Sequence, residues 1–277
     1  MTARLEKRFV AMRQRGEKGV LPYITAGDGG LDTTLAVMRA LERAGAAGIE
    51  LGLPFSDPIA DGPALQAAAQ RALEAGTTLE RVLDVVRRFR VESELPLVLM
   101  TYANPLVRRG LARACGMLHE AGLDGVLVVD LPLEEAAPLL DAARAVELAA
   151  IFFASPTSSD DRIRRAARAS RGYLYAIGRL GVTGRRTALD ETTLAFLRRV
   201  RELSGDLALA AGFGIASPDQ VRAVHAEADL AIVGTALVEH IHRAASTGSR
   251  ADPALAAAAA EEFLRPMTLA PASQRLP

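Results

Sequence analysis

The chain has 277 residues, and half of them are apolar, which is enough for one sizeable buried core or two small ones. Its charges balance at a formal net of zero, and no block of like charge marks a nucleic-acid-binding arm or a polybasic membrane patch. No apolar run approaches a membrane span, residues 1–15 lack a signal-peptide pattern, and the lone Cys115 cannot form an internal disulfide, so we expect a cytoplasmic protein.

Short apolar runs recur along the chain, with helix-like stretches between them. Most runs are continuously apolar, as expected for parallel strands that are covered on both faces. Eight such alternations without a break in composition favour one closed (β/α)8 barrel over an open sheet. The expected strands begin near Val20, Ala47, Leu97, Gly125, Ala149, Gly172, Leu207 and Asp229.

Helical spacing of apolar residues fills the intervals, for example at Leu79, Val82, Val86 and Phe89. Residues 2–15 form an expected opening helix and residues 1–265 the barrel domain. Residues 266–277 contain three prolines, and we expect them to form a loose tail, with a docked tail as the alternative. Further signals agree with these boundaries: expected helix starts at Asp32, Asp190 and Ser217, and expected helix ends at Gly45 and Gly122.

Glu50 stands between Ile49 and Leu51 in the second expected strand. If its neighbours pack outward on the helices, Glu50 points into the barrel, because successive strand residues face opposite sides. A carboxylate buried there is costly unless it is used or paired, and burial raises its pKa toward the range of acid–base catalysis. A structural Glu paired with a neighbouring base is the alternative interpretation.

Asp61 follows in the loop after the same strand, at the end where barrel enzymes build their active sites. Its position before an expected helix also fits simple N-capping. Beside Glu50, however, it suggests two carboxylates at one barrel mouth, one buried and one wetter, that divide acid and base work.

Two glycine loops follow the seventh and eighth strands, which is the common phosphate-binding position of this fold. Glycine lets backbone amides approach an anion, and a helix start adds partial positive charge. Each glycine alone also fits a tight turn, and the pair does not select one reaction. The expected phosphate site comprises Gly212, Phe213 and Gly214, then Gly234 and Thr235, with Gly184 of the sixth loop closing it.

Residues 50–66, ELGLPFSDPIADGPALQ, resemble the signature of the tryptophan synthase alpha subunit family. The motif is long and specific, and the resemblance extends over roughly residues 2–245 in barrel order. Shorter matches stand at the ends of other expected strands: YITAGD at 23–28, MTYANP at 100–105, VDLP at 129–132 and GVTG at 181–184.

The resemblance implies a lyase that cleaves indole-3-glycerol phosphate to indole and glyceraldehyde 3-phosphate by a retro-aldol reaction. It makes Glu50 the proton carrier at the indole carbon and Asp61 the acceptor of a hydrogen bond from the indole nitrogen. Tyr175 corresponds to the family's active-site tyrosine, although a core aromatic is the alternative, and it shares strand parity with Tyr173. Phe213 either flanks the indole ring or packs in the core. The implied substrate pocket further includes Tyr23, Tyr102 and Thr183.

The resemblance also implies a partner, a beta subunit that receives the indole in an α2β2 tetramer. Pro54, Phe55 and Asp57 lie in the loop that would face it, and an exposed Phe55 is apolar surface that a partner could cover. The partner, not this chain, would hold pyridoxal phosphate. We expect no metal site, because His240 and His242 lie on different helix faces and His119 and His225 stand apart.

Some positions depart from the family pattern. Gly29 replaces a usual proline, Tyr23 a common phenylalanine, and Thr235 a usual serine. Gly178 and Leu180 replace expected serines beside the sixth loop, which puts the closure of that loop in question. Three rivals stay open: another phosphate-binding barrel, a barrel kept as a regulatory subunit, and a free-standing lyase without a partner.

Overall fold

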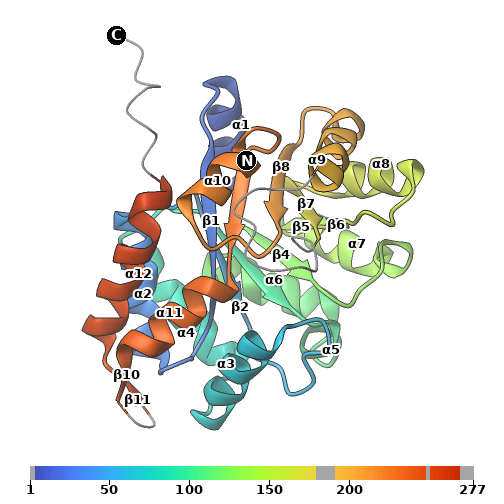
Figure 1. Ribbon diagram of the computed structural model, residues 1–277. Coiled ribbons are helices and arrows are strands. Elements are labelled where there is room, and N and C mark those ends of the chain that lie inside the picture. Colours follow the sequence, from blue (N-terminus) through green and yellow to red (C-terminus); the bar gives the residue numbers. More distant parts are fainter. Residues whose placement is uncertain (1–3, 179–190, 248–249, 269–277) are drawn as a thin grey trace.

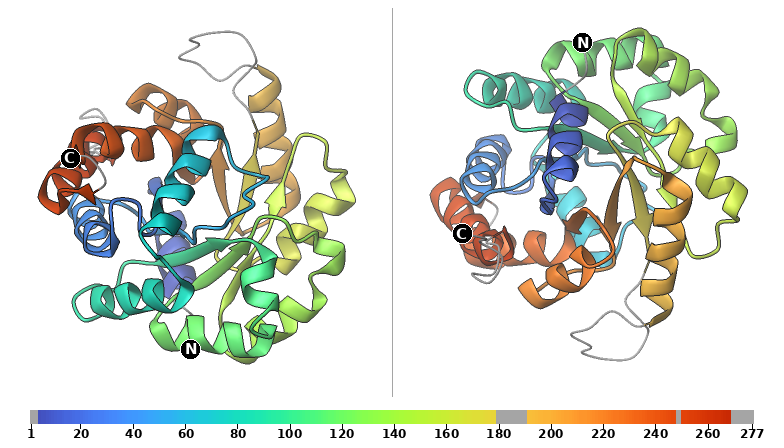
Figure 2. Two further views of the ribbon diagram at one scale, coloured as in Figure 1. Left: turned by 90° about the horizontal axis from the view of Figure 1, so that it is seen from below. Right: turned by 90° about the horizontal axis from the view of Figure 1, so that it is seen from above.

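The computed structural model describes residues 4–178, 191–247 and 250–268. Within these ranges, a ring of parallel strands is surrounded by helices (Figures 1 and 2). β5 and β6 flank Phe152 and form one interrupted barrel strand, β5 pairing with β4 and β6 with β7. The sheet therefore closes as a (β/α)8 barrel. Its strands are β1 Gly19–Thr25, β2 Ile49–Gly52, β3 Leu97–Thr101, β4 Gly125–Val128, β5 Ala149–Ile151, β6 Phe153–Ala154, β7 Tyr173–Ile177, β8 Ala208–Gly212 and β9 Leu230–Val233.

With β5 and β6 taken as one barrel strand, each of the eight strands starts within two residues of the position predicted from its apolar run. The helices also follow their predicted stripes, since Leu79, Val82, Val86 and Phe89 are all buried on α4. The helices are α1 Arg4–Gln14, α2 Leu31–Arg43, α3 Pro63–Glu74, α4 Leu79–Arg90, α5 Ala103–Val107, α6 Leu111–Ala121, η1 Leu133–Glu135, α7 Ala137–Ala145, α8 Asp160–Ala169, α9 Glu191–Ser204, α10 Pro218–His225, α11 Thr235–Ala245 and α12 Pro253–Thr268.

The predicted helix boundaries are mostly confirmed. Ser217 caps α10 by accepting a hydrogen bond from the Gln220 amide, and Gly122 ends α6 in the left-handed conformation. Asp32 lies in the first turn of α2 rather than at its cap, and pairs with Arg88 instead. Asp190 lies outside the described residues.

The amino-terminal end of the barrel is closed by α1 (Figure 2, right). Leu5, Phe9 and Met12 of this helix are buried against side chains of the barrel interior, and the Phe9 ring meets Tyr173 edge-on at 5.9 Å. The carboxyl-terminal end of the barrel, where loops follow the strands, is the end at which barrel enzymes build their active sites.

Two buried aspartates brace the amino-terminal end. Asp124, just before β4, accepts the Leu97 amide of β3 at 2.8 Å and pairs with Arg90 of α4 at 2.7 Å. Asp229, just before β9, accepts the Leu209 amide of β8 at 2.9 Å and pairs with Arg201 of α9. In both places, one buried aspartate links two adjacent strands to the helix that precedes them in the chain.

The expectation of a loose tail from Pro266 onward is wrong for its first residues. α12 continues through Pro266 to Thr268, buries Leu264 and Met267, and packs against α2 and α11. Pro266 falls in the last turn of α12, and the helix ends two residues later at Thr268. A short hairpin, β10 Ser246–Thr247 with β11 Arg250–Ala251, precedes α12. No helix in the described ranges is long and apolar enough to cross a membrane.

Candidate active site

Glu50 points into the barrel, as the alternation along β2 predicts. Ile49 and Leu51 belong to the outer core between the sheet and the helices, whereas Glu50 stands level with Tyr23 of β1 and Val98 of β3. Only 1% of Glu50 is exposed, so its carboxyl group is cut off from water.

One carboxyl oxygen of Glu50 is held and the other is free. The Tyr173 hydroxyl donates a hydrogen bond to Oε1 at 2.5 Å, while Oε2 is buried without a hydrogen-bond partner among the described residues. Burial raises the pKa of Glu50 to about 7, and the Tyr173 hydrogen bond partly offsets this rise. Among the described residues, the hydrogen-bond partner of Glu50 is thus a tyrosine and not the base that the structural alternative requires.

The sequence assigns no role to Tyr173, although strand parity predicts that it faces the same side as Tyr175 of β7. Both tyrosines are buried and face the interior. The Tyr175 ring lies 5.2 Å from Phe153, and its hydroxyl covers Gly212, where any Cβ would overlap it. Burial and the charge of Glu50 raise the pKa of Tyr175 well above its usual range, so its hydroxyl is protonated.

Asp61 lies at the end of the loop between β2 and α3, and is partly exposed. It does not cap α3, since Gly62 takes the cap position and no side chain bonds there. Burial raises the pKa of Asp61, and a hydrogen bond with Tyr102 counters the rise. The predicted division into one buried and one wetter carboxylate is therefore observed.

Tyr102 organises the loop that carries Asp61. Its hydroxyl accepts the Ala60 amide at 3.0 Å, and its ring stacks on Phe55 with 5.0 Å between centroids. Tyr23 approaches from the other side: its hydroxyl lies 3.4 Å from Thr25 Oγ1 and covers Gly52 so closely that a Cβ there would overlap it. Burial raises the pKa of Tyr23, and the charges of Asp61 and Glu50 add to the rise, which places its hydroxyl within the electric field of both carboxylates.

The two glycine loops stand side by side at the ends of β8 and β9, which are paired strands. Gly214 has a left-handed φ of 74°, which favours glycine, and Gly234 directly precedes α11, whose first residue is Thr235. The start of α11 therefore lies at the rim of the barrel beside the loop that follows β8.

Phe213 packs in the core. It is 2% exposed, meets Phe196 edge-on at 6.4 Å, and its ring fills the space that a Cβ on Gly178 would need. Of its two interpretations, packing is the one observed. The glycine at 178, which departs from the family pattern, thus has a steric reason. Three predicted positions of the sixth loop, Leu180, Thr183 and Gly184, lie outside the described residues.

The loop proposed to face a partner is only partly exposed. Pro54 is buried and Phe55 is turned onto Tyr102, whereas Asp57 is exposed. The apolar side chain that stands out in this loop is Ile59, which is 83% exposed and was not singled out from the sequence. A surface hollow is lined by the start of the same loop and by the segment after β3, including Leu53, Pro54, Phe55, Asn104, Pro105 and Arg108.

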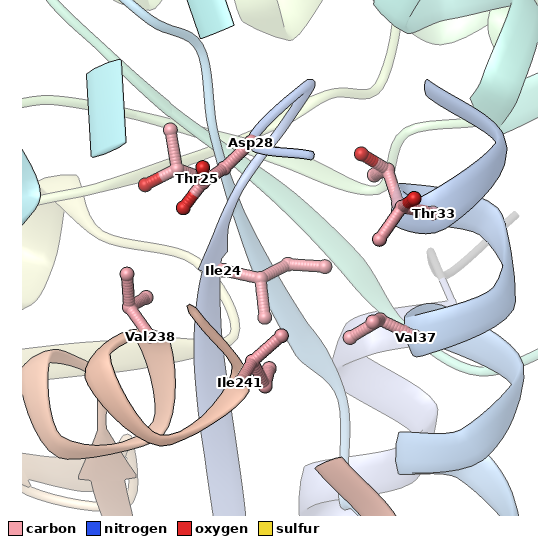
Figure 3. A pocket seen from close by; sticks show the side chains of 8 residues that line it. Ile24, Thr25, Asp28, Thr33, Val37, Val238 and Ile241 are labelled. Atoms are coloured by element: carbon pink, nitrogen blue, oxygen red, sulfur yellow. The ribbon is translucent and has the colours of Figure 1, made fainter. Parts of the chain in front are cut away.

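A separate small cavity lies between β1, α2 and α11 (Figure 3). Thr25, Asp28 and Thr33 line its polar end, and Ile24, Val37, Val238 and Ile241 its apolar side. Neither Glu50 nor Asp61 lines it, so it is distinct from the carboxylate site.

The family model that matches this chain and two of its relatives carry the same description. The family model described as "Tryptophan synthase alpha chain" matches residues 9–266. The tryptophan synthase alpha chain of Alkalilimnicola ehrlichii is 47% identical over 261 residues, covering 93% of this chain and 94% of that protein. That of Caulobacter vibrioides is 44% identical over 243 residues, or 87% and 88% of the two chains.

Solved structures show the same likeness in three dimensions. Tryptophan synthase subunit alpha of Legionella pneumophila superposes with a TM-score of 0.87 at 34% identity, over 96% of this chain and 97% of that one. A chain of the tryptophan synthase α2β2 complex of Pyrococcus furiosus gives 0.83 at 34% identity, over 90% and 97%.

Proposed function

The chain belongs to the tryptophan synthase alpha chain family, and on that premise we propose that Glu50 and Asp61 divide the proton transfer and charge stabilisation of its reaction. The family is a lyase of tryptophan biosynthesis, and this chain cleaves indole-3-glycerol phosphate to indole and glyceraldehyde 3-phosphate. The residue roles below are the proposal.

Glu50 is the proton carrier. In its protonated form it donates to the indole carbon that bears the glycerol phosphate chain. The adjacent hydroxyl of that chain then returns a proton to Glu50 as the carbon–carbon bond breaks, which gives the aldehyde and restores the indole ring. A pKa of about 7 suits both directions of this exchange.

Asp61 acts on the positive charge that protonation creates. Protonated at carbon, the indole ring carries positive charge at nitrogen, and an ionised carboxylate that accepts the N–H hydrogen bond stabilises it. The wetter position of Asp61 keeps it more readily ionised than Glu50, so the two carboxylates take different roles.

The remaining pocket residues fit the two ends of the substrate. The hydroxyls of Tyr175, Tyr23 and Tyr102 surround the carboxylates at the indole end. At the other end, the loops of Gly212 to Gly214 and Gly234, with Thr235 at the start of α11, offer amides and a hydroxyl to the phosphate. Thr183 and Gly184 would complete this end from the sixth loop.

One observation carries the assignment: the buried Glu50 has one oxygen held by Tyr173 and one free of partners among the described residues. Its test is Glu50→Gln, which is nearly isosteric but cannot carry a proton. We expect the fold to persist and turnover to fall by more than about 100-fold. Turnover within a few-fold of the unchanged protein would refute the role.

We further propose a beta subunit as partner in an α2β2 assembly, as in the Pyrococcus furiosus complex. Pro54 and Phe55 line the hollow, and the exposed Asp57 and Ile59 follow them in the same loop, so this loop supplies both apolar and polar surface for a partner. Gel filtration with and without a beta subunit tests the assembly. Indole release that rises strongly with the partner supports it, and fast release unchanged by the partner would indicate a free-standing lyase.

The proposed reaction moves protons and electron pairs between the substrate and Glu50 alone. Its balance therefore needs no metal or redox cofactor in this chain, and pyridoxal phosphate would belong to the beta subunit. We place the protein in the cytoplasm, which suits the free, buried thiol of Cys115.

A further inference from the structure

The helix that follows Asp61 has little apolar anchoring. Its fully buried side chains are Ala68, Ala69 and Ala72, each with a single methyl group, while the larger Leu65 and Leu73 are only half-buried. Leu65 packs against the small cluster of Tyr23 and Val238. A single methyl group buries little apolar area, so the alanine contacts by themselves hold the helix only weakly against sliding or turning. Seen from the carboxyl ends of the strands, α3 lies beside the barrel mouth (Figure 2, left).

Two polar ties compensate for this. Gln66, in the first turns of α3, donates from Nε2 to the backbone carbonyl of Asp61 at 2.9 Å. Arg71, near the other end, donates from Nε and Nη2 to the two carboxylate oxygens of Asp28 at 2.7 and 2.8 Å. A two-pronged arginine–carboxylate pair fixes direction as well as distance, and this one is largely shielded, with 31% and 16% of the side chains exposed.

Asp28 is a firm anchor because its loop is tightly built. The neighbouring Gly27 has a left-handed φ of 86°, donates its amide to Thr34 Oγ1 at 2.8 Å, and is covered by Thr77 from the turn after α3. Figure 3 shows Asp28 on this loop at the end of β1, beside Thr25. The anchor therefore belongs to the barrel wall.

We propose that Gln66 and Arg71 are positioning residues for Asp61. Arg71 locks α3 to Asp28 at the end of β1, and Gln66 passes that fixed position to the backbone of Asp61, whose carboxylate must meet the indole nitrogen. A misplacement of about 1 Å in such a group can cost on the order of 100-fold in rate. This inference rests on the proposed role of Asp61.

The test is a double-mutant cycle on the rate of indole formation from indole-3-glycerol phosphate, with enzyme in excess so that slow single turnovers are measured. Arg71→Met should lower this rate roughly tenfold or more in the unchanged chain, with a smaller effect on KM. In the Asp61→Ala background the same change should cost less than about twofold, because the group that Arg71 positions is missing. Arg71→Lys, which keeps the charge but not the two-pronged geometry, should restore the rate only in part.

Arg88→Met is the matched control, since it removes an arginine from the exposed 2.9 Å pair with Asp32 without touching α3. It should leave the rate unchanged. If Arg71→Met fails to fold, Gln66→Met serves the same cycle, because Gln66 is exposed and its loss leaves the helix contacts intact. Equal fold losses in both backgrounds would overturn the inference. Unchanged turnover in Asp61→Ala alone would refute the proposed role of Asp61, and this inference with it.

Discussion

The Tyr173 hydroxyl lies 2.5 Å from Oε1 of Glu50, joining two strands that face each other across the barrel. The bond orients the carboxyl group and stabilises its ionised form, in opposition to the burial that favours the protonated form. The pKa of Glu50 therefore depends on two opposing effects: burial raises it, and the hydrogen bond from Tyr173 lowers it.

Tyr173→Phe should move that balance. A hydrogen bond to a charged group contributes about 1.5–3 kcal/mol, and its loss leaves burial unopposed, so the pKa of Glu50 rises above about 7. The limb of the pH profile of kcat/KM that reports Glu50 should move to higher pH. Tyr23→Phe is the control and should leave that limb in place. An unmoved limb in Tyr173→Phe would mean that the hydrogen bond does not tune Glu50.

Glu50→Gln should make the protein more stable at alkaline pH. The pKa of Glu50 is about 7 in the folded chain and about 4.3 when unfolded, so between these values only the unfolded state gives up its proton. The free energy of unfolding contributed by this group therefore falls as pH rises through that window and stays low above it. The variant should exceed the unchanged protein by on the order of 3 kcal/mol at pH 8 in urea unfolding. The gap should vanish at pH 4, and a gap that persists there would point to a packing effect instead.

Asp61→Asn should lower turnover less than Glu50→Gln does, because the amide oxygen still accepts a hydrogen bond but carries no charge. Rates with indole-3-glycerol phosphate and its N-methyl analogue separate the two effects. The analogue has no N–H to donate, so the substitution should cost it less. Equal losses for both substrates would contradict a hydrogen bond from the indole nitrogen to Asp61.

Gly178→Ser should destabilise the fold, although serine is usual in the family at this position. The new Cβ would overlap the ring of Phe213, and such overpacking costs about 1–3 kcal/mol in thermal or urea unfolding. Phe213→Leu in the same chain should recover part of the loss. Gly116→Ala is the control, since a Cβ there meets nothing within 4 Å on α6, and it should be neutral or slightly stabilising. A neutral Gly178→Ser would show that the Phe213 ring yields without cost.

Much of this architecture follows from local pattern. Continuous apolar runs and helical stripes involve only residues close together in the chain, so the positions of the strands and helices could be predicted from them. The alternation of side chains along a strand was likewise enough to predict that Glu50 points inward. Which side chains meet across the barrel depends on register between distant strands, so Tyr173 could be seen to face inward but not to bind Glu50. The end of α12 was missed because Pro266 is a helix breaker in most contexts, whereas here Met267 is held by core packing beyond it.

In the loop after β2, sequence pointed to Phe55 as exposed surface, but stacking on Tyr102 draws it inward and leaves Ile59 outside. Similarly, Asp61 stood where an N-cap is common, and only the position of Gly62 decides against it. Both outcomes depend on how a single loop folds over its neighbours, which no periodicity encodes.

The two aspartate braces at the amino-terminal end stand four barrel strands apart, and each is complete within its own half of the chain. Arg90, Leu97 and Asp124 all precede β5, whereas Arg201, Leu209 and Asp229 all follow it. A chain cut between β4 and β5 would therefore give two fragments that each keep a brace, and we expect them to reassemble when co-expressed. The matched braces are also what a barrel would inherit from the duplication of an ancestral half-barrel.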